Sequence, residues 1–416
     1  MRFRERLRTN SNSLTNNSNL GPQSSRWVVL GVALAIQVST SIVAAALPVL
    51  LPLVKSEFHL TFAQAGVLAN FPYAGSFFTL ALAGWAVDTL GDRVVLVVGG
   101  LVTGVAALAT AIAPSLALVL VALLVMGAGI SMPTPAGSIA VRGAFSLKLR
   151  GTVMGIRQTG IPIGSFFAAI ALPPMALASG WRVAVAVAGA ASIVIAVAGL
   201  RIYRSKPRPG ESSVPSTTLL RVFNRRIAVA GLSGLLMVSG QMCLLTYLGA
   251  FLIRDRDLSI TNAAFYLGLA SLAGAFGRVL WGMVSDRFLS SSRRGALLMA
   301  GAFGAVGSIG LAILPNSLPF PFLVAAILLC ATGAVGWNSV QVIFLSELAP
   351  IGSEGRGVGL GQMIQQPGIL LGPFLFGWIV DATASFRPAW LLLAGFLLVA
   401  MMTIATVGES PQSRST

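Results

Sequence analysis

The chain has 416 residues, of which 56% are hydrophobic and only 10% are charged. Because a soluble domain carries about a quarter charged residues, this composition excludes an ordinary soluble protein and indicates one that lies in a membrane. The net charge of +16 does not indicate a nucleic-acid partner here, since the lysines and arginines cluster in short connections between apolar segments.

The first 25 residues, MRFRERLRTNSNSLTNNSNLGPQSS, precede the first apolar segment. They are basic and then rich in serine and asparagine, whereas a secretory signal runs from its basic part directly into an apolar core. Such a polar stretch cannot bury enough apolar surface to fold. We predict a disordered cytoplasmic tail over 1–25.

Twelve apolar segments follow, and at roughly twenty residues each they are long enough to cross a bilayer as helices. Their ranges are 27–54, 62–87, 93–113, 116–141, 151–178, 183–202, 227–253, 261–285, 295–314, 319–346, 357–381 and 387–408. In lipid only helices and closed barrels satisfy every backbone amide, and these segments lack the alternation of barrel strands. We predict an all-α membrane protein with twelve transmembrane helices.

A long polar stretch between the sixth and seventh segments divides the chain into two similar halves. Gly84 and Asp88 in GWAVD match Gly282 and Asp286 in GMVSD, and QTGIPIG at 158–164 matches QPGILLG at 366–372. Correspondences at a nearly constant offset indicate a duplicated unit. We predict six-helix bundles over 26–202 and 227–408, a cytoplasmic central loop over 203–226 and a cytoplasmic tail over 409–416.

The basic residues also orient the predicted helices. With the N-terminus inside, 21 of the 28 lysines and arginines fall on the cytoplasmic side, and only five fall outside. Cytoplasmic loops carry the basic excess in membrane proteins. We therefore predict a multi-pass protein of the inner (plasma) membrane with both termini in the cytoplasm, and no nucleic-acid partner.

The loop Gly84-Trp-Ala-Val-Asp88-Thr-Leu-Gly91-Asp92-Arg93, together with the six-plus-six pattern, resembles the major facilitator superfamily. Its signature is G-x3-D-x2-G-R-(K/R), from which this chain departs at Asp92 and Val94. The resemblance implies two six-helix bundles that alternate around a central site. It also implies that the loop residues keep the outward-facing conformation closed on the cytoplasmic side. These residues are Gly84, Asp88, Gly91, Arg93, Gly282, Asp286 and Arg287. The alternative is that the loop charges are solvated and only set the topology.

Arg157 lies inside the fifth predicted segment, in GTVMGIRQTGIPIGS. A charge within a membrane span is expensive and indicates a functional site. Gly160 and Gly164 fall near its face of the helix, where they leave room for a ligand or for a neighbouring helix. We expect Arg157 to bind substrate. The alternatives are that it reaches the inner interface or pairs with Gln158 or a carbonyl.

Arg278 lies in the eighth predicted segment, two turns before Asp286. An arginine four residues before the loop glycine is similar to the pattern of the oxalate/formate, monocarboxylate, nitrate and cyanate-type porters. That resemblance implies that Arg278 faces the translocation path and holds an anion. The alternative is that it pairs with Asp286 at the gate.

Carboxylates are absent from the middle of every predicted span, since Glu347 and Asp381 lie at span ends. Two arginines from opposite halves can hold one anion, because a guanidinium pairs well with a carboxylate. Uncharged groups complete the predicted lining: Gln37, Thr40, Ser41, Gln158, Gln241, Trp337, Asn338, Gln341, Gln362, Gln365 and Gln366. For each of them alone, a hydrogen bond between helices is the alternative.

These features predict a secondary active transporter of a small anionic solute, an organic carboxylate in particular, that works as a monomer among membrane lipids. We expect no enzyme activity, cofactor or metal, since one histidine and two cysteines give no metal-ligand spacing. Efflux of amphipathic drug-like compounds is one alternative, although Leu123 stands where related antiporters carry an arginine. A transport-inactive membrane sensor is another.

Overall fold

The computed structural model describes residues 25–145, 153, 156–203, 223–289, 292–315, 318–350 and 354–408. The predicted tails, apart from Ser25, and positions 204–222 of the predicted central loop lie outside the described residues. Every regular element in the described part is helical, as predicted.

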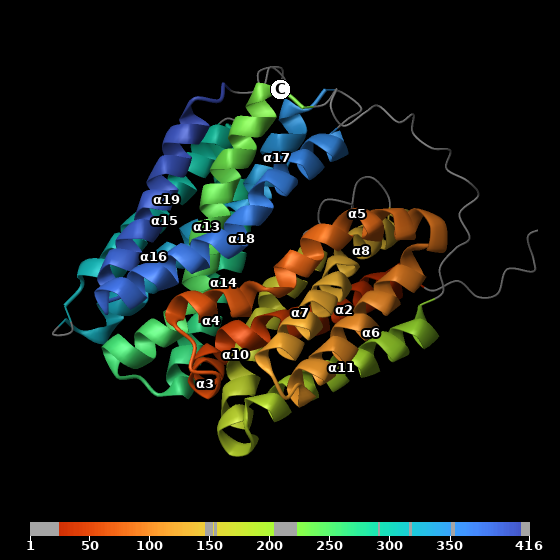
Figure 1. Ribbon diagram of the computed structural model, residues 1–416. Coiled ribbons are helices and arrows are strands. Elements are labelled where there is room, and N and C mark those ends of the chain that lie inside the picture. Colours follow the sequence, from red (N-terminus) through yellow and green to blue (C-terminus); the bar gives the residue numbers. More distant parts are fainter. Residues whose placement is uncertain are drawn as a thin grey trace, which may run out of the picture.

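The first half consists of nine described helices (Figure 1). They are α2 (Arg26–Val49), α3 (Leu51–Glu57), α4 (Phe62–Asn70), α5 (Pro72–Leu90), α6 (Asp92–Ile112), α7 (Leu116–Ser131), α8 (Pro133–Ala144), α10 (Gly160–Ser179) and α11 (Trp181–Ile202).

The second half continues in the same manner. Its described elements are α13 (Arg225–Arg256), α14 (Ile260–Met283), a short π-helix η1 (Val284–Phe288), α15 (Arg293–Ile313), α16 (Phe320–Ala334), α17 (Asn338–Leu348), α18 (Glu354–Thr383) and α19 (Arg387–Ala405). Within the described residues, eleven helical segments are long and apolar enough to span a membrane. The second predicted span, 62–87, is divided between α4 and α5, which meet at Phe71.

Other predicted spans are also interrupted. The segment 27–54 breaks at Leu50, between α2 and α3, and two further breaks have a local reason. The segment 116–141 breaks between α7 and α8 at Pro133, because proline lacks the amide that would continue the helical ladder. The segment 319–346 breaks after α16, where a Cβ on Gly336 would come within 2.2 Å of the Thr332 carbonyl oxygen. Each break places irregular backbone inside the protein, where neighbouring groups can satisfy it.

The surface is that of a protein in lipid. Large apolar side chains face outward on many helices, and Ile112 and Val194 keep 82% and 66% of their surface exposed. A soluble monomer rarely exposes such extensive apolar surface. The exposed apolar side chains agree with the predicted membrane helices.

The two halves form separate groups of helices in Figure 1, and equivalent helices pack in the same way in both. Helix α10 packs on α2, and α18 packs on α13. A Cβ on Gly164 would lie 2.6 Å from the Ser41 Cβ, and one on Gly372 would lie 2.7 Å from the Ser239 Cβ. Small residues therefore allow the same close approach of helices in both halves.

The halves meet at one end of the molecule, which we call the closed end. Four hydrogen bonds join them there: Asp381 accepts from the amides of Phe62 and Ala63, Asn70 donates to Thr246, and Tyr247 donates to Phe62. Helix α4 packs on α18, and α10 on α14.

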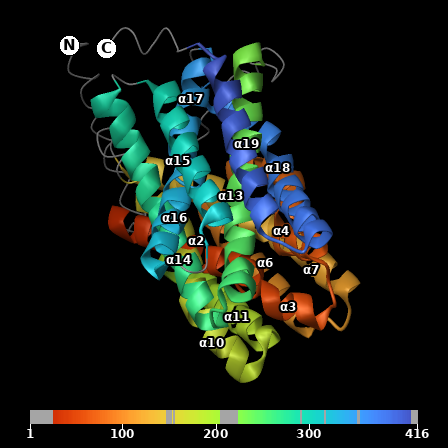
Figure 2. The same cartoon turned by 90° about the vertical axis from the view of Figure 1, so that its left-hand side faces the viewer.

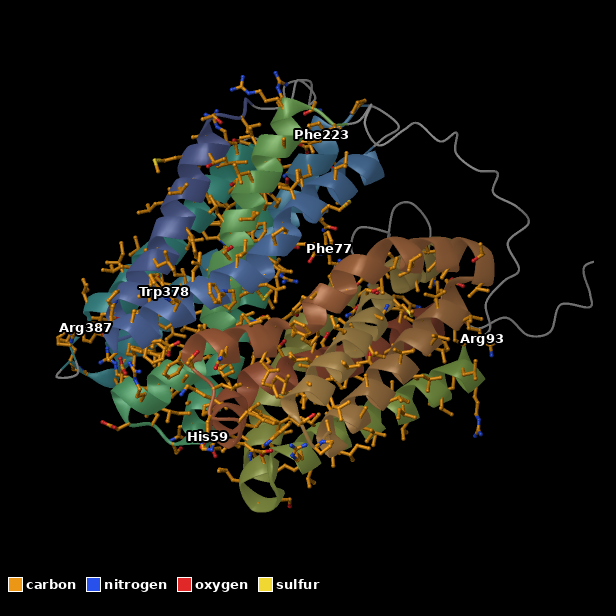
Figure 3. The ribbon with its side chains drawn as sticks, viewed as in Figure 1. His59, Phe77, Arg93, Phe223, Trp378 and Arg387 are labelled. Carbon is orange, nitrogen blue, oxygen red and sulfur yellow. The ribbon has the colours of Figure 1, made fainter. Side chains whose placement is uncertain are left out.

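The ribbons of the two halves diverge toward the other end, which we call the open end (Figure 1). Figure 2 shows α17 toward one end of the molecule and α3 toward the other. In Figure 3, His59 and Arg387 lie at the closed end, and Arg93 and Phe223 lie toward the open end.

Candidate functional site

Arg157 is completely buried, in the turn that precedes α10. Its Nη1 donates to the Ser138 hydroxyl at 3.0 Å, and its Nη2 donates to Gln37 Oε1 at 3.2 Å. Nη2 also reaches the carbonyl oxygens of Pro133 and Thr134 at 3.2 and 3.0 Å. The guanidinium thus joins α2 to the first turn of α8, beside the break in the fourth predicted span.

Glycines bring the backbone close to this arginine. A Cβ on Gly137 would lie 2.7 Å from Arg157 Nε, which has no hydrogen-bond partner. A Cβ on Gly160 would lie 3.0 Å from Gln37 Cγ. The room that the glycines were expected to leave is filled by α2 and by Arg157 itself.

The polar residues predicted to line one face of α2 lie on the side of that helix that contacts Arg157 and α10. Gln37, Thr40 and Ser41 are all buried. Thr40 donates to the Ile36 and Gln37 carbonyls, and Gln37 Nε2 donates to Ser41 Oγ at 3.4 Å. The structure brings Gln37 to Arg157, whereas Gln158, the next residue along the chain, is exposed.

Arg278 on α14 has a different environment. It is partly buried, and its Nε is buried with no hydrogen-bond partner from the residues that the structure describes. Among the described residues, none forms an ion pair with its guanidinium. It lies near Tyr73, at the start of α5 in the opposite half. Arg278 is therefore a cation between the two halves that no described carboxylate neutralises.

Most of the predicted lining in the second half carries buried polar atoms that have no hydrogen-bond partner among the described residues. These atoms are Gln241 Oε1, Trp337 Nε1, Gln341 Oε1, Gln365 Nε2 and Gln366 Oε1. Gln341 uses its other end to donate to the Ala230 carbonyl at 2.7 Å, and Asn338 and Gln362 are partly buried. Because buried polar atoms normally find a partner, this group of side chains is suited to hydrogen-bonding a polar solute.

The first loop of the predicted gate is tied to its own half. Gly91 has a φ of 85°, which explains the glycine at this turn. Asp92 accepts a hydrogen bond from the Tyr203 hydroxyl at 2.8 Å, and Arg93 donates to the Leu200 carbonyl. Gly84 and Asp88 belong to α5, and the Asp88 side chain lies outside the described part of the structure.

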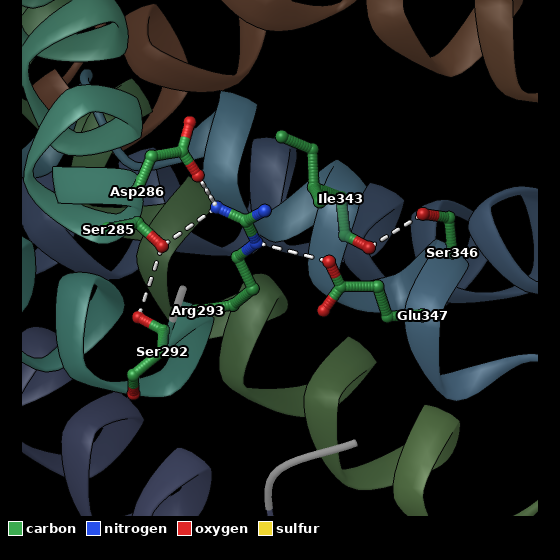
Figure 4. A network of polar contacts seen from close by, with 7 residues as sticks. All are labelled: Ser285, Asp286, Ser292, Arg293, Ile343, Ser346 and Glu347. Carbon is green, nitrogen blue, oxygen red and sulfur yellow. Dashed lines mark hydrogen bonds and ion pairs between the residues drawn. The ribbon is translucent and has the colours of Figure 1, made fainter. Parts of the chain in front are cut away.

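The second loop forms a polar network that Figure 4 shows. Arg293 pairs with Asp286 and, through Nε at 3.1 Å, with Glu347 on α17. It also donates to Ser285 Oγ at 2.9 Å. Asp286 therefore pairs with Arg293 and not with Arg278, while Arg287 is exposed and a Cβ on Gly282 would meet nothing within 4 Å.

Several residues of these networks were not assigned a role from the sequence. Arg293 could have been suspected, since the pair Arg293–Arg294 follows the second loop and the family signature ends in basic residues. No local signal marked Tyr73, or Asp381 as a partner of α4. Among the described residues, no group of three or more His, Cys, Asp or Glu could hold a metal ion.

Residues 32–373 match the sequence profile of the Major Facilitator Superfamily. The chain belongs to this superfamily. A major facilitator protein is a transporter and not an enzyme, so the predicted class of activity is confirmed.

The similar proteins agree with this major facilitator assignment. The chain is 29% identical to an uncharacterized MFS-type transporter of Mycobacterium tuberculosis, over 90% of this chain and 84% of that one. It is 25% identical to a probable sulfoacetate transporter of Cupriavidus necator (90% and 91% covered) and 24% identical to a hexuronate transporter of Bacillus subtilis (86% and 89% covered).

A solved structure confirms the major facilitator fold. A bacterial homologue of the human lysosomal transporter Spinster superposes with a TM-score of 0.77 at 19% identity, covering 93% of this chain and 97% of that one. The protein is therefore a multi-pass secondary transporter.

Proposed function

We propose that this major facilitator protein transports a small organic anion, a carboxylate or a sulfonate, and that Arg278 binds the anionic group. The observation that carries the proposal is the Arg278 guanidinium, which lies between the halves near Tyr73 and has no carboxylate partner among the described residues. A guanidinium offers a planar pair of donors that matches a carboxylate or sulfonate.

The distribution of acidic residues supports an anionic substrate. Every aspartate and glutamate among the described residues lies in a loop or near the end of a helix. An organic cation would therefore meet positive charge and no carboxylate in the middle of the protein, and like charges at low dielectric repel strongly. The transported classes named for the relatives in C. necator and B. subtilis, a sulfonate and a sugar acid, are both anions.

The buried glutamine and tryptophan atoms of the second half supply the rest of the proposed site. Gln241, Gln341, Gln366 and Trp337 present both acceptors and donors without protein partners. Such groups can hydrogen-bond hydroxyl groups or the second oxygen of an acid. They favour a polar anion over an amphipathic drug.

In the proposed site, Arg157 has a structural and electrostatic role and does not contact the substrate. Its four hydrogen bonds end on protein groups, and it has no exposed surface in this conformation. It positions Gln37 and the break before α8, and its charge adds to the positive potential that attracts an anion.

In the proposed transport cycle, the two halves move relative to one another so that the open end and the closed end exchange roles. The closed end is the outer face, and both termini lie in the cytoplasm, in accord with the basic excess of the cytoplasmic loops. Closure of the open end brings Asp88 and Arg93 toward the second half, as the loop signature implies. The contacts between α4 and α18 then separate.

Uptake into proteoliposomes tests the proposal. The purified protein is reconstituted and offered radiolabelled sulfoacetate, a hexuronate, a monocarboxylate and, for comparison, an organic cation. Arg278→Gln should reduce anion uptake by about tenfold or more, since a charge-assisted pair contributes about 1.5–3 kcal/mol. Arg278→Lys should retain part of it.

Two control variants separate binding from folding and from bulk charge. Arg201→Gln removes one exposed positive charge at the open end and should leave uptake unchanged. Melting temperatures in detergent establish that each variant is folded. Saturable cation uptake that is unaffected by Arg278→Gln would overturn the proposal and support the drug-efflux alternative.

A further inference from the structure

A positively charged pocket lies at the closed end, lined by residues of the second half alone. It has a volume of about 320 Å³. The end of α13, the end of α15 and the beginning of α19 form its walls. Its lining residues are Phe251, Arg254, Asp255, Arg256, Asp257, Leu311, Ala312, Leu314 and Arg387.

Arg256 is the fixed cation of this pocket. Its Nη2 donates to the Leu314 carbonyl at 2.7 Å, and its guanidinium lies 5.5 Å from the centre of the Phe251 ring. These contacts hold the guanidinium, while its buried Nε has no hydrogen-bond partner in the described part of the chain. A donor that is buried and unpaired favours an acceptor supplied from outside the protein.

Arg387 adds a second charge from the first residue of α19. Its side chain is exposed (Figure 3), and it repels Arg256 electrostatically. Neither arginine forms an ion pair with a carboxylate among the described residues. Two guanidinium groups that lack an ion pair among the described residues thus share one pocket, an arrangement that an anion between them would stabilise.

The carboxylates of the rim compensate these two charges only in part, because Asp255 attracts Arg256 electrostatically but forms its ion pair with Arg254. Asp255 pairs with Arg254 at 3.0 Å, and Arg254 also donates to the Ala384 carbonyl at 3.3 Å. Asp257 is exposed at the end of α13, where it adopts a left-handed conformation with a φ of 54°. Three arginines and two aspartates leave the pocket with an excess of positive charge.

The arginines of this pocket lie at the closed end, which is the outer side of the membrane in the proposed orientation. Five basic residues were assigned to this side from the sequence, and three of them line this pocket. A fourth, Arg182, is neutralised by Glu57 at 2.8 Å. Because basic residues are depleted on this side in membrane proteins, their concentration in one pocket requires a local reason.

We infer that this pocket is an oxyanion-binding site, separate from the proposed transport path. Arg256 and Arg387 would hold a phosphate, sulfate or sulfonate group, and Phe251 and Leu311 would contact its apolar substituent. The pocket is large enough for one such group and a short substituent. Two sources share this chemistry: the phosphate of an anionic lipid, or a free oxyanion at the membrane surface.

Binding measurements on the purified protein test this inference. In neutral detergent, inorganic phosphate is titrated by calorimetry against the intact protein, Arg256→Gln and Arg387→Gln. Each variant should bind phosphate about tenfold more weakly, the effect of losing one hydrogen bond to a charged group. Arg201→Gln, which removes an equal charge at the open end, should bind like the intact protein.

A second arm identifies the source of the oxyanion. Nanodiscs of phosphatidylcholine alone are compared with nanodiscs that also contain phosphatidylglycerol. If the lipid is the ligand, phosphatidylglycerol raises the melting temperature of the intact protein but not of Arg256→Gln, and it competes with inorganic phosphate. If a free oxyanion is the ligand, phosphate alone has this effect.

The inference is overturned if the intact protein binds phosphate no more tightly than Arg256→Gln and Arg387→Gln do. It is equally overturned if Arg201→Gln weakens binding as much, since the effect would then be one of net charge. Arg278→Gln should retain phosphate binding at this pocket. Failure of the transport proposal and failure of this inference are therefore distinguishable.

Discussion

The carboxylate of Asp381 accepts hydrogen bonds from the backbone amides of Phe62 and Ala63, both at 2.9 Å, so that a residue near the end of α18 caps the first turn of α4. Asp381 and Phe62 are 319 positions apart and belong to different halves. A carboxylate at a helix N-terminus satisfies free amides and interacts favourably with the helix dipole. This contact therefore stabilises the conformation in which the closed end is shut.

Asp381→Ala should shift the protein toward the conformation with the closed end open. Loss of an N-terminal cap costs about 1 kcal/mol, so the ratio of the two conformations should change about fivefold. Spin labels at Arg201 and Phe288, on opposite halves at the open end, should report a larger population of short distances.

Asp257→Asn is the matched control, because Asp257 is an exposed carboxylate at the same end that caps no helix start. Asp381→Asn should give an intermediate shift, since its amide oxygen can still accept one hydrogen bond. An unchanged distance distribution in Asp381→Ala would show that the cap does not hold the closed end.

Gly137→Ala should destabilise the protein by disturbing Arg157. The added Cβ would lie 2.7 Å from Arg157 Nε, whose guanidinium is fixed by four hydrogen bonds. Overpacking of a buried site costs about 1–3 kcal/mol. The melting temperature in detergent should fall, whereas Gly31→Ala should be neutral because its Cβ would meet nothing within 4 Å.

Glu57 should make the closed end sensitive to acid. Partial burial raises the pKa of the Glu57 carboxyl, but hydrogen bonds from Trp181 and Arg182 and the charge of Arg182 outweigh it, so the pKa lies below its ordinary value of 4.5. The folded state thus favours the ionised form. Its contribution to stability is complete above about pH 4.5 and is lost as the pH falls through the folded-state pKa.

The pH dependence of the melting temperature from pH 6 to pH 3 measures this contribution. Glu57→Gln should melt at a lower temperature than the intact protein at pH 6, and the difference between the two should shrink as the pH falls toward 3. A constant difference between them across this range would contradict the assignment.

Gly91→Ala should destabilise the first loop, because Gly91 has a φ of 85° and a ψ of 157°. Residues other than glycine rarely adopt this backbone conformation, and the strain costs about 1–3 kcal/mol of folding free energy. Gly282→Ala in the second loop is the control, since its added Cβ would be in open space. Equal melting temperatures for the two variants would contradict the role given to Gly91.

The sequence identified many residues of the candidate site, but it did not predict which groups each of them contacts. The sequence singled out Arg157 and Arg278 equally, because both are charges inside apolar segments. The structure separates them: Arg157 has four protein acceptors, whereas Arg278 has no ion-pair partner among the described residues. Partners depend on the rotation of each helix about its axis, and position along the chain does not specify that rotation.

The sequence by itself determined the membrane location, the helical class and the superfamily. A bilayer requires long apolar segments and backbones whose hydrogen bonds are satisfied internally. The loop around Gly91 requires a glycine. Each of these properties depends on a short stretch of sequence and can be read from it. The tertiary structure alone decided that Asp286 pairs with Arg293, that Asp381 caps α4, and that three arginines share one pocket. These contacts join residues from different helices, and they exist only once the helices have packed.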